Sequence, residues 1–310
     1  MEPQPTLDQL QIFLAVIEAG SFSAAARKLG RAQSVVSYGI GNLEAQLGIA
    51  LFQRAGTRQP LLTAAGAALA EDARRMTAAL QALRARAHGL RQGLEPEVRL
   101  AVDALFPAPV LADVLKAFLA RFPTVGLRLH TGALGAVWDQ LLQGEADLGI
   151  AGAPDSHLDL LSVRPLGGAT ILPVAAPGHP LACLPGPVPA AQVREHLQIV
   201  VTDQTPHTRG RDFRVIGLTP WRVTDMATKR DLICAGLGWG GLPHWMAEED
   251  LAAGRLTALD LEPYPPSPYR ITALWPVSQP PGPAVSWLVE EVRAALEACA
   301  GSARWDDADA

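Results

Sequence analysis

Residues 21–66 read SFSAAARKLGRAQSVVSYGIGNLEAQLGIALFQRAGTRQPLLTAAG, and this stretch decides the fold of the N-terminal part of the chain. Ala24, Ala25, Ala26 and Leu29 give a short helix a narrow apolar face. Ser21 or Ser23 is expected to cap this helix, because a short hydroxyl side chain satisfies free amides at a helix start. Gly30 is expected to end it, since glycine tolerates the left-handed conformation that follows many helices.

A longer helix is predicted from about residue 33 to residue 47, ended by Gly48. Its apolar residues are spaced 4, 3 and 4 apart and should face a core: Val36, Ile40, Leu43 and Leu47. The opposite face carries short polar or small residues together with one tyrosine: Ser34, Ser37, Tyr38 and Gly41. A helix that reads base edges in the major groove needs such a face.

Further elements flank these two helices. Leu10, Phe13, Leu14 and Ile17 form one stripe of an earlier helix. Residues 51–52 and 61–62 are expected to form two short strands around a basic tip that contains Arg54 and Arg58, placed to touch phosphate or the minor groove. Three helices and a hairpin in this order predict a winged helix-turn-helix.

Two segments carry a resemblance to a known family. Residues 13–54, FLAVIEAGSFSAAARKLGRAQSVVSYGIGNLEAQLGIALFQR, and residues 62–66, LTAAG, resemble the DNA-binding domain of LysR-type transcriptional regulators without a gap. Family members often carry serine where Ala32 stands, and loss of that helix cap costs about 1 kcal/mol. Many carry arginine where Tyr38 stands, and Gly39 and Gly41 each cost about 1 kcal/mol relative to alanine inside a helix. The candidate DNA-binding residues are Arg31, Gln33, Ser34, Ser37, Tyr38, Arg54 and Arg58.

Composition and charge agree with a DNA-binding N-terminal part. The net charge of the whole chain is −5, but residues 1–95 carry 10 Lys and Arg against 7 Asp and Glu. Positive charge therefore lies with the predicted DNA-reading segment. There is no apolar run of about 20 residues and no signal-peptide pattern at the start, and the three cysteines are far apart. We therefore expect a reduced, cytoplasmic protein.

A heptad pattern follows the hairpin. Apolar residues recur at spacings of 4 and 3 over three heptads, as a and d positions do in a coiled coil: Leu69, Ala73, Met76, Leu80, Leu83, Ala87 and Leu90. This helix either packs on its own domain or pairs two chains, and the family resemblance favours pairing. Gly89, Gly93 and Pro96 mark the end of the helix and a hinge.

From residue 98 onward, strand and helix patterns alternate, which predicts mostly parallel α/β sheets. The expected strands are residues 98–103, 126–131, 147–151, 171–175, 199–202, 222–224 and 270–275. The expected helices are residues 108–121, 136–143, 190–196, 227–236, 244–253 and 285–299.

The same half of the chain also resembles the family. VDALFP (102–107), FLARFPTVGLRL (118–129), QGEADLGIAG (143–152), WRVTDMATKRDLICAGLGWGGLP (221–243) and DLAAGRL (250–256) resemble the family's effector-binding domain. The resemblance implies a fold like a periplasmic binding protein, with two α/β lobes and a cleft. We therefore expect a winged helix-turn-helix at 1–63, a linker helix at 64–95, and an effector domain at 96–300. The chain should cross between lobes near Leu166 and return near Pro265, and residues 301–310 should form an acidic tail.

Four loops are candidates for the effector site, at residues 103–106, 131–134, 202–205 and 225–228. Ligands in α/β folds bind beyond the carboxyl ends of strands and beside helix starts, as these loops are expected to lie. The alternative for Asp103 and Asp225 is that each only caps the following helix. A basic and aromatic cluster of Arg222, Lys229, Arg230, Trp221 and Trp239 either contacts an effector or a neighbouring chain, or places Lys229 and Arg230 on a solvated helix face. The candidate effector residues are Asp103, Ala104, Leu105, Thr131, Gly132, Thr202, Asp203, Asp225 and Thr228.

Other motifs do not indicate chemistry. Residues 236–241, GLGWGG, follow a helix and precede a strand, the reverse of a dinucleotide-binding loop, so these glycines are expected to end a helix and allow close packing around Trp239. The seven histidines lack metal-site spacing, no spacing supports a cysteine redox switch, and no nucleophile motif is present. We therefore expect no metal, no cofactor and no enzymatic activity.

The sequence thus predicts a transcriptional regulator that binds double-stranded promoter DNA, answers a small-molecule effector and forms a dimer, with a tetramer implied by the resemblance. Two alternatives stay open. One is a cytoplasmic small-molecule-binding α/β protein with an incidental helical domain. The other is a protein-interaction regulator whose helix-turn-helix no longer binds DNA.

Overall fold

The structure, a computed structural model, describes residues 4–53, 60–133, 135–153, 159–202, 205 and 213–299. The chain divides into two compact units, Met1–Gly89 and Leu90–Ala310. Each unit has its own hydrophobic core, so the two are described separately.

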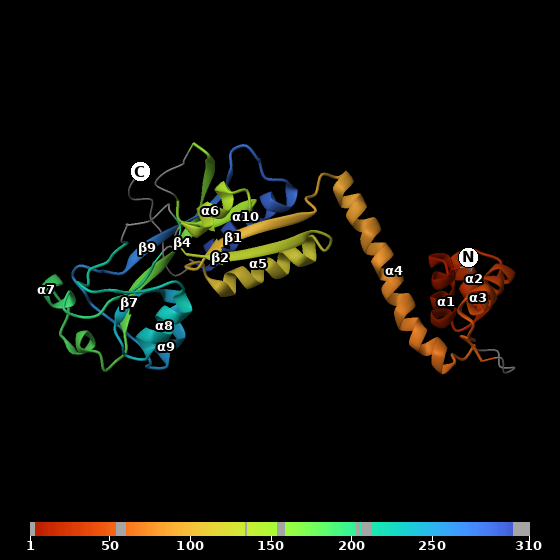
Figure 1. Cartoon of the computed structure of the whole chain (residues 1–310), viewed down its shortest axis with the longest axis horizontal. Coiled ribbons are helices and arrows are strands. Elements are labelled where there is room, and N and C mark those ends of the chain that lie inside the picture. Colours follow the sequence, from red (N-terminus) through yellow and green to blue (C-terminus); the bar gives the residue numbers. More distant parts are fainter. Residues whose placement is uncertain are drawn as a thin grey trace. The chain divides into compact units, whose positions relative to one another are not determined.

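The N-terminal unit consists of α1 (Leu7–Ala19), α2 (Phe22–Leu29), α3 (Gln33–Leu47) and most of the long helix α4 (Ala64–Arg91) (Figure 1). Thr6 and Gln9 form a capping box at the start of α1, and Ser21, not Ser23, caps α2 by accepting from the amide of Ala24 at 3.1 Å. Glycines in the left-handed conformation end the three short helices: Gly20, Gly30 and Gly48. The predicted bounds of α3 and both of its flanking glycines are confirmed.

The core of this unit is closely packed where α1 crosses α3. Val36, Ile40 and Leu43 of α3 are at most 3% exposed and pack among the buried residues of α1. A Cβ atom at Gly39 would lie 2.9 Å from Cδ1 of Ile12, whereas one at Gly41 would meet nothing within 4 Å. A side chain at position 39 would therefore displace the end of the Ile12 side chain, whereas one at position 41 would have open space.

The base of the hairpin agrees with the predicted strand pair. Phe52 and Leu62 form an antiparallel bridge, and the amide of Gln53 donates to the carbonyl of Leu61 at 2.7 Å. A Cβ atom at Gly66 would lie 2.1 Å from the carbonyl oxygen of Leu51, so only glycine fits where α4 begins against this hairpin. Arg54 and Arg58 lie outside the described residues.

The C-terminal unit is built on one mixed sheet with the strand order β2-β1-β3-β9-β4-β7, in which β8 also pairs with β4. Two long strands, β4 and β9, run antiparallel to each other and join the two lobes. Their register shifts between Pro165 and Gly167, close to the predicted crossing point. The strand bounds are β1 Glu97–Asp103, β2 Gly126–Gly132, β3 Leu148–Ala151, β4 Leu161–Ala175, β7 Trp239–Pro243, β8 Thr257–Ala258 and β9 Ser267–Pro276.

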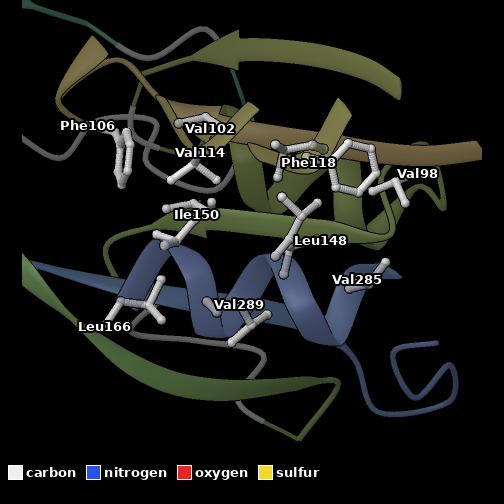
Figure 2. Packing of buried hydrophobic residues seen from close by; sticks show 14 of the residues in the cluster. Val98, Val102, Phe106, Val114, Phe118, Leu148, Ile150, Leu166, Val285 and Val289 are labelled. Atoms are coloured by element: carbon white, nitrogen blue, oxygen red, sulfur yellow. The ribbon is translucent and has the colours of Figure 1, made fainter. Parts of the chain in front are cut away.

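In the first lobe, helices cover both faces of the sheet. α5 (Ala108–Arg121) and α10 (Pro283–Cys299) contribute to one apolar cluster with β1 and β3, and Figure 2 shows Val285 and Val289 of α10 beside Leu148 and Ile150 of β3. α6 (Ala136–Leu142) belongs to a separate cluster with Ala101 of β1 and Leu274 of β9. The alternation of side chains along β1 therefore divides its residues between two clusters.

The second lobe surrounds the far halves of β4 and β9. It contains the short parallel pair β5 (Ile199–Val201) and β6 (Trp221–Val223), together with α7 (Ala190–Val193), α8 (Met226–Cys234), α9 (His244–Ala252) and the 3₁₀ turn η1 (Pro180–Cys183). Trp239 of β7 is fully buried and packs edge-to-face on Tyr264. Backbone or side-chain atoms would lie within 2.6 Å of a Cβ at Gly238, Gly240 or Gly241.

Two predictions made from the sequence for the C-terminal unit differ from its structure. The prediction of mostly parallel sheets was wrong, because β4 pairs antiparallel with β7, β8 and β9, and β3 pairs antiparallel with β9. A strand that leaves a lobe and one that returns to it run in opposite directions, which accounts for the β4–β9 pairing. The glycine-rich stretch does allow the predicted close packing around Trp239, but residues 239–243 are themselves strand β7.

Candidate functional site

The exposed face of α3 is the candidate nucleic-acid interface. Ser34, Ser37 and Tyr38 are exposed on it, with Tyr38 at 70% exposure, while the opposite face is buried in the core. Ala32 occupies the N-cap position with no side-chain hydrogen bond to the first turn. The predicted polar face of α3 is therefore exposed to solvent, and the start of α3 has no side-chain cap.

Arg31, also predicted to bind DNA, lies in the turn before α3 and has a partner within its own unit. Its two terminal nitrogens donate to the two carboxylate oxygens of Asp8, each at 2.7 Å. A bidentate arginine–carboxylate pair of this kind has a fixed orientation. Gln33 is the first residue of α3 and is exposed.

The heptad stripe of α4 divides into two parts. Leu69 and Ala73 pack against the core of the N-terminal unit, as the first interpretation of this helix predicted. Met76, Leu83 and Leu90 are 54%, 63% and 49% exposed. The later part of the stripe is therefore apolar and accessible to another surface.

A cavity of about 320 Å³ lies within the C-terminal unit. Its volume lies in the range of small-molecule sites. The wall takes residues from both lobes, including Trp138 and Gly152 of the first and Gln198, Val200, Met226 and Lys229 of the second. Its other lining residues are Leu105, Ala153, Ile171, Val201, Phe213, Arg214, Gly241, Tyr264, Ser267, Pro268 and Tyr269.

The structure brings the loops at residues 103–106 and 131–134 together, and it joins the start of the loop at 202–205 to the end of β6, just before the loop at 225–228. The amide of Ala104 donates to the carbonyl of Gly132 at 2.8 Å, and the amide of Thr202 donates to the carbonyl of Val223 at 2.8 Å. Of the nine predicted effector residues, Leu105 lines the cavity. Asp103, Ala104, Thr131, Gly132, Thr202, Asp225 and Thr228 lie outside its lining, and Asp203 lies outside the described residues.

Asp103 is buried behind the cavity wall rather than capping a helix. Its Oδ1 accepts from the amide of Leu105 at 2.8 Å and its Oδ2 accepts from the hydroxyl of Tyr269 at 2.8 Å. Burial raises the pKa of Asp103 to about 6, against the opposing effect of these two hydrogen bonds. Helix α5 begins after Pro107 with no side-chain cap, so the capping interpretation of Asp103 was wrong.

Asp225 does cap its helix. It is exposed at the start of α8, and its Oδ1 accepts from the amide of Thr228 at 2.7 Å. Hydrogen bonds from Thr228 hold the pKa of this carboxyl below its usual value. The capping interpretation of Asp225 is therefore confirmed.

Lys229 is not on a solvated helix face. Its residue is 7% exposed, it lines the cavity, and burial lowers its pKa to about 8. Arg230, the next residue, turns away to Asp250, whose side chain is fully buried between Arg230 and Arg255. The helical stripe Met226, Lys229 and Ile233 is buried as a whole, and this spacing was the sequence signal that identifies Lys229 as an inward residue.

The two lobes also contact each other beside the cavity. The indole nitrogen of Trp245, in α9, donates to the carbonyl of Leu105 at 3.1 Å. Ala104 and Leu105 pack against an apolar cluster of the second lobe. The loop after β1 follows a strand of the first lobe and lines the cavity through Leu105. The same loop therefore also contacts the second lobe.

Other chemistry finds no support in the part of the chain that the structure describes. Among those residues, no group of three or more His, Cys, Asp or Glu is placed to hold a metal ion. No single described helix has the length and apolar character to cross a membrane, and the bent pair α1–α2 meets that test by length and composition only.

Comparison with known proteins identifies the family. Residues 7–67 match the family described as bacterial regulatory helix-turn-helix protein, lysR family, and residues 91–297 match the LysR substrate binding domain. The chain belongs to the LysR-type transcriptional regulators. It is therefore a regulator rather than an enzyme: its helix-turn-helix binds double-stranded DNA and its substrate-binding domain binds a small-molecule effector.

Individual relatives agree with the family assignment. This LysR-type chain is 34% identical to the regulator YeeY of Escherichia coli K12 over 82% of both chains, and 32% identical to the probable regulator YhaJ of the same strain over 93% of this chain and 95% of YhaJ. Among solved structures, a mutant of OxyR from Corynebacterium glutamicum matches with a TM-score of 0.53 and 21% identity, covering 96% of this chain and 95% of that one. That structural likeness supports the fold.

Proposed function

We propose that this LysR-type regulator reads DNA through the exposed face of α3 and senses its effector in the cavity of the C-terminal unit. The observation that carries the DNA-reading part is the division of α3 into a core face and an exposed polar face. Short polar side chains on such a face reach base edges in the major groove. The proposed contacts at the helix are Arg31, Gln33, Ser34, Ser37 and Tyr38.

We assign phosphate contact to the hairpin tip through Arg54 and Arg58. Arginine neutralises phosphate charge without reading sequence, so these contacts add affinity and salt dependence. Arg31 is bound to Asp8, so it would contact DNA only after releasing that carboxylate. If it keeps Asp8 as its partner, its role would instead be to hold the turn before α3 in place. The regulator is proposed to act in the cytoplasm.

Dimerisation is assigned to α4. The exposed apolar residues Met76, Leu83 and Leu90 share heptad spacing, and a second copy of the same helix would bury them. A dimer places two α3 helices at half-sites about one helical turn apart, or a multiple of that distance. The family resemblance implies further assembly to a tetramer.

The effector role of the cavity rests on its position. It is lined from both lobes and lies beside the hydrogen bond from Trp245 to Leu105, so a bound molecule would contact both lobes at once. A ligand that favours one arrangement of the lobes shifts the population of that arrangement.

DNA footprinting of the full chain tests the proposed reading face. Tyr38→Ala and Ser37→Ala are compared with Lys116→Ala, a change at an exposed residue of α5. We expect the two α3 variants to lose protection of a specific site while the α5 variant keeps it. Unchanged protection by both α3 variants would contradict the assignment.

A further inference from the structure

Lys229 is a buried cation on the cavity wall without a counter-ion. The residue is 7% exposed, and among the described residues its ammonium group has no hydrogen-bond or salt-bridge partner. Its pKa is lowered by burial alone, with no carboxylate acting in the opposite direction. A buried charge with no partner is costly, so its retention at the wall of a cavity points to a ligand of opposite charge.

A second cation shares this wall. The guanidinium of Arg214 lies 3.7 Å from the centre of the Tyr264 ring, donates to the carbonyl of Pro265 at 2.7 Å and also bonds the hydroxyl of Ser267. It forms no salt bridge within the described part of the chain. Arginine presents five donors, so bonds to these two oxygens leave further donors for a ligand.

The nearby carboxyl group does not neutralise these cations. Asp103 is 3% exposed and lies behind Tyr269, whose hydroxyl donates to it and accepts from the amide of Gly152 at 2.9 Å. Asp103 does not line the cavity and is not among the groups that shift the pKa of Lys229.

The remainder of the wall is apolar and aromatic. The amide side chain of Gln198 is used within the protein, because it accepts from Ile216 and Gly217 and donates to Arg214. The surfaces left for a ligand body come from hydrophobic or aromatic side chains: Trp138, Ile171, Val200, Met226, Tyr264 and Tyr269. Such a wall suits a compact apolar body.

We propose that the effector is a small carboxylate with an apolar body, whose carboxylate is bound by Lys229 and Arg214. Lysine supplies a point charge and arginine a planar set of donors, and a carboxylate accepts from both. This inference rests on the proposed effector role of the cavity and adds the chemical class of the ligand to it.

The test is a thermal-shift and calorimetric titration of the full chain at pH 7 and constant ionic strength. The probes are benzoate, phenylacetate and hexanoate, each paired with its primary amide (benzamide, phenylacetamide, hexanamide) and with an amine (benzylamine, phenethylamine, hexylamine). Lys229→Met removes the charge at similar size, Lys229→Arg keeps it, and Lys116→Met removes an exposed charge as the control.

We expect at least one carboxylate to stabilise the protein and its amide and amine not to do so. Lys229→Met should weaken that binding roughly 10- to 100-fold, the range of a charge-assisted hydrogen bond, while Lys229→Arg retains part of it and Lys116→Met all of it. Absence of a carboxylate response, or equal affinity in Lys229→Met, overturns the proposal. Binding of amides or amines instead would leave the cavity as the effector site and reject only the carboxylate class.

Discussion

The hydroxyl of Tyr269, on a strand that joins the two lobes, donates to Oδ2 of Asp103 at the end of β1 over 2.8 Å. The same hydroxyl accepts from the amide of Gly152, after β3, at 2.9 Å. One phenol therefore joins three chain segments behind the cavity and keeps a buried carboxyl hydrogen-bonded. Burial of Tyr269 itself raises the pKa of its hydroxyl well above the usual value, and the negative charge of Asp103 and the hydrogen bond to its carboxyl act in the same direction.

Tyr269→Phe is expected to destabilise the C-terminal unit by roughly 1 to 3 kcal/mol, because Asp103 loses a donor and the Gly152 amide loses an acceptor. Thermal unfolding of the full chain, without ligand, measures the effect. Tyr38→Phe is the matched control, since Tyr38 is 70% exposed on α3. Equal unfolding temperatures for the two variants would contradict the structural role given to Tyr269.

Lys229→Met is expected to stabilise the ligand-free protein at pH 7, by up to about 3 kcal/mol, as follows from a pKa lowered from 10.5 to about 8. Below pH 8 both the folded and the unfolded protein hold the proton, so the buried charge has its full cost. As the pH rises from 8 to 10.5 the folded protein releases the proton first, and the cost fades.

Chemical unfolding of wild type and Lys229→Met at pH 7 and at pH 10 measures this difference. The stability gain of the variant should be larger at pH 7 than at pH 10. A variant less stable than wild type at pH 7 would mean that Lys229 has a stabilising partner in the folded protein.

Ala32→Ser is expected to stabilise the N-terminal unit by about 1 kcal/mol, because Ala32 is the N-cap of α3 and makes no side-chain hydrogen bond there. Ser21→Ala is the reverse change at α2, where Ser21 does accept from the amide of Ala24, and it should cost a similar amount. Thermal unfolding of the two variants should shift in opposite directions, and shifts of the same sign would refute the capping account.

Arg54→Ala is expected to weaken binding to all DNA sequences and to lower the slope of log affinity against log salt by about one for each hairpin that binds. Fluorescence anisotropy with specific and nonspecific duplexes at several salt concentrations gives both quantities. Lys116→Ala removes an exposed cation of the other unit and should leave the slope as in wild type. A slope unaltered in Arg54→Ala would count against phosphate contact by this hairpin.

The helix-turn-helix was predictable because its signals are local. The spacing of Val36, Ile40 and Leu43 defines the inner face of α3, and Gly30 and Gly48 mark the ends of α2 and α3. Each of these signals lies within a few residues of the structure it specifies, so no knowledge of tertiary packing is needed.

The cavity was less predictable because its wall combines distant segments. Trp138 of the first lobe and Lys229 of the second line one cavity only because the chain leaves the first lobe along β4 and returns along β9, and the mixed sheet that results was not predicted. The sequence analysis left two interpretations of Lys229 open, contact with an effector or a neighbouring chain, and a solvated helix face shared with Arg230. The position of Lys229 between Met226 and Ile233 on one helical stripe was the signal against a solvated face.

The most direct test of this account is a footprint of the purified full chain on fragments of the genome that encodes it, at two salt concentrations. The account predicts a protected site with dyad symmetry, read by two copies of α3, and weaker protection at the higher salt concentration. Absence of any protected site at the lower salt concentration would contradict DNA reading by this chain alone.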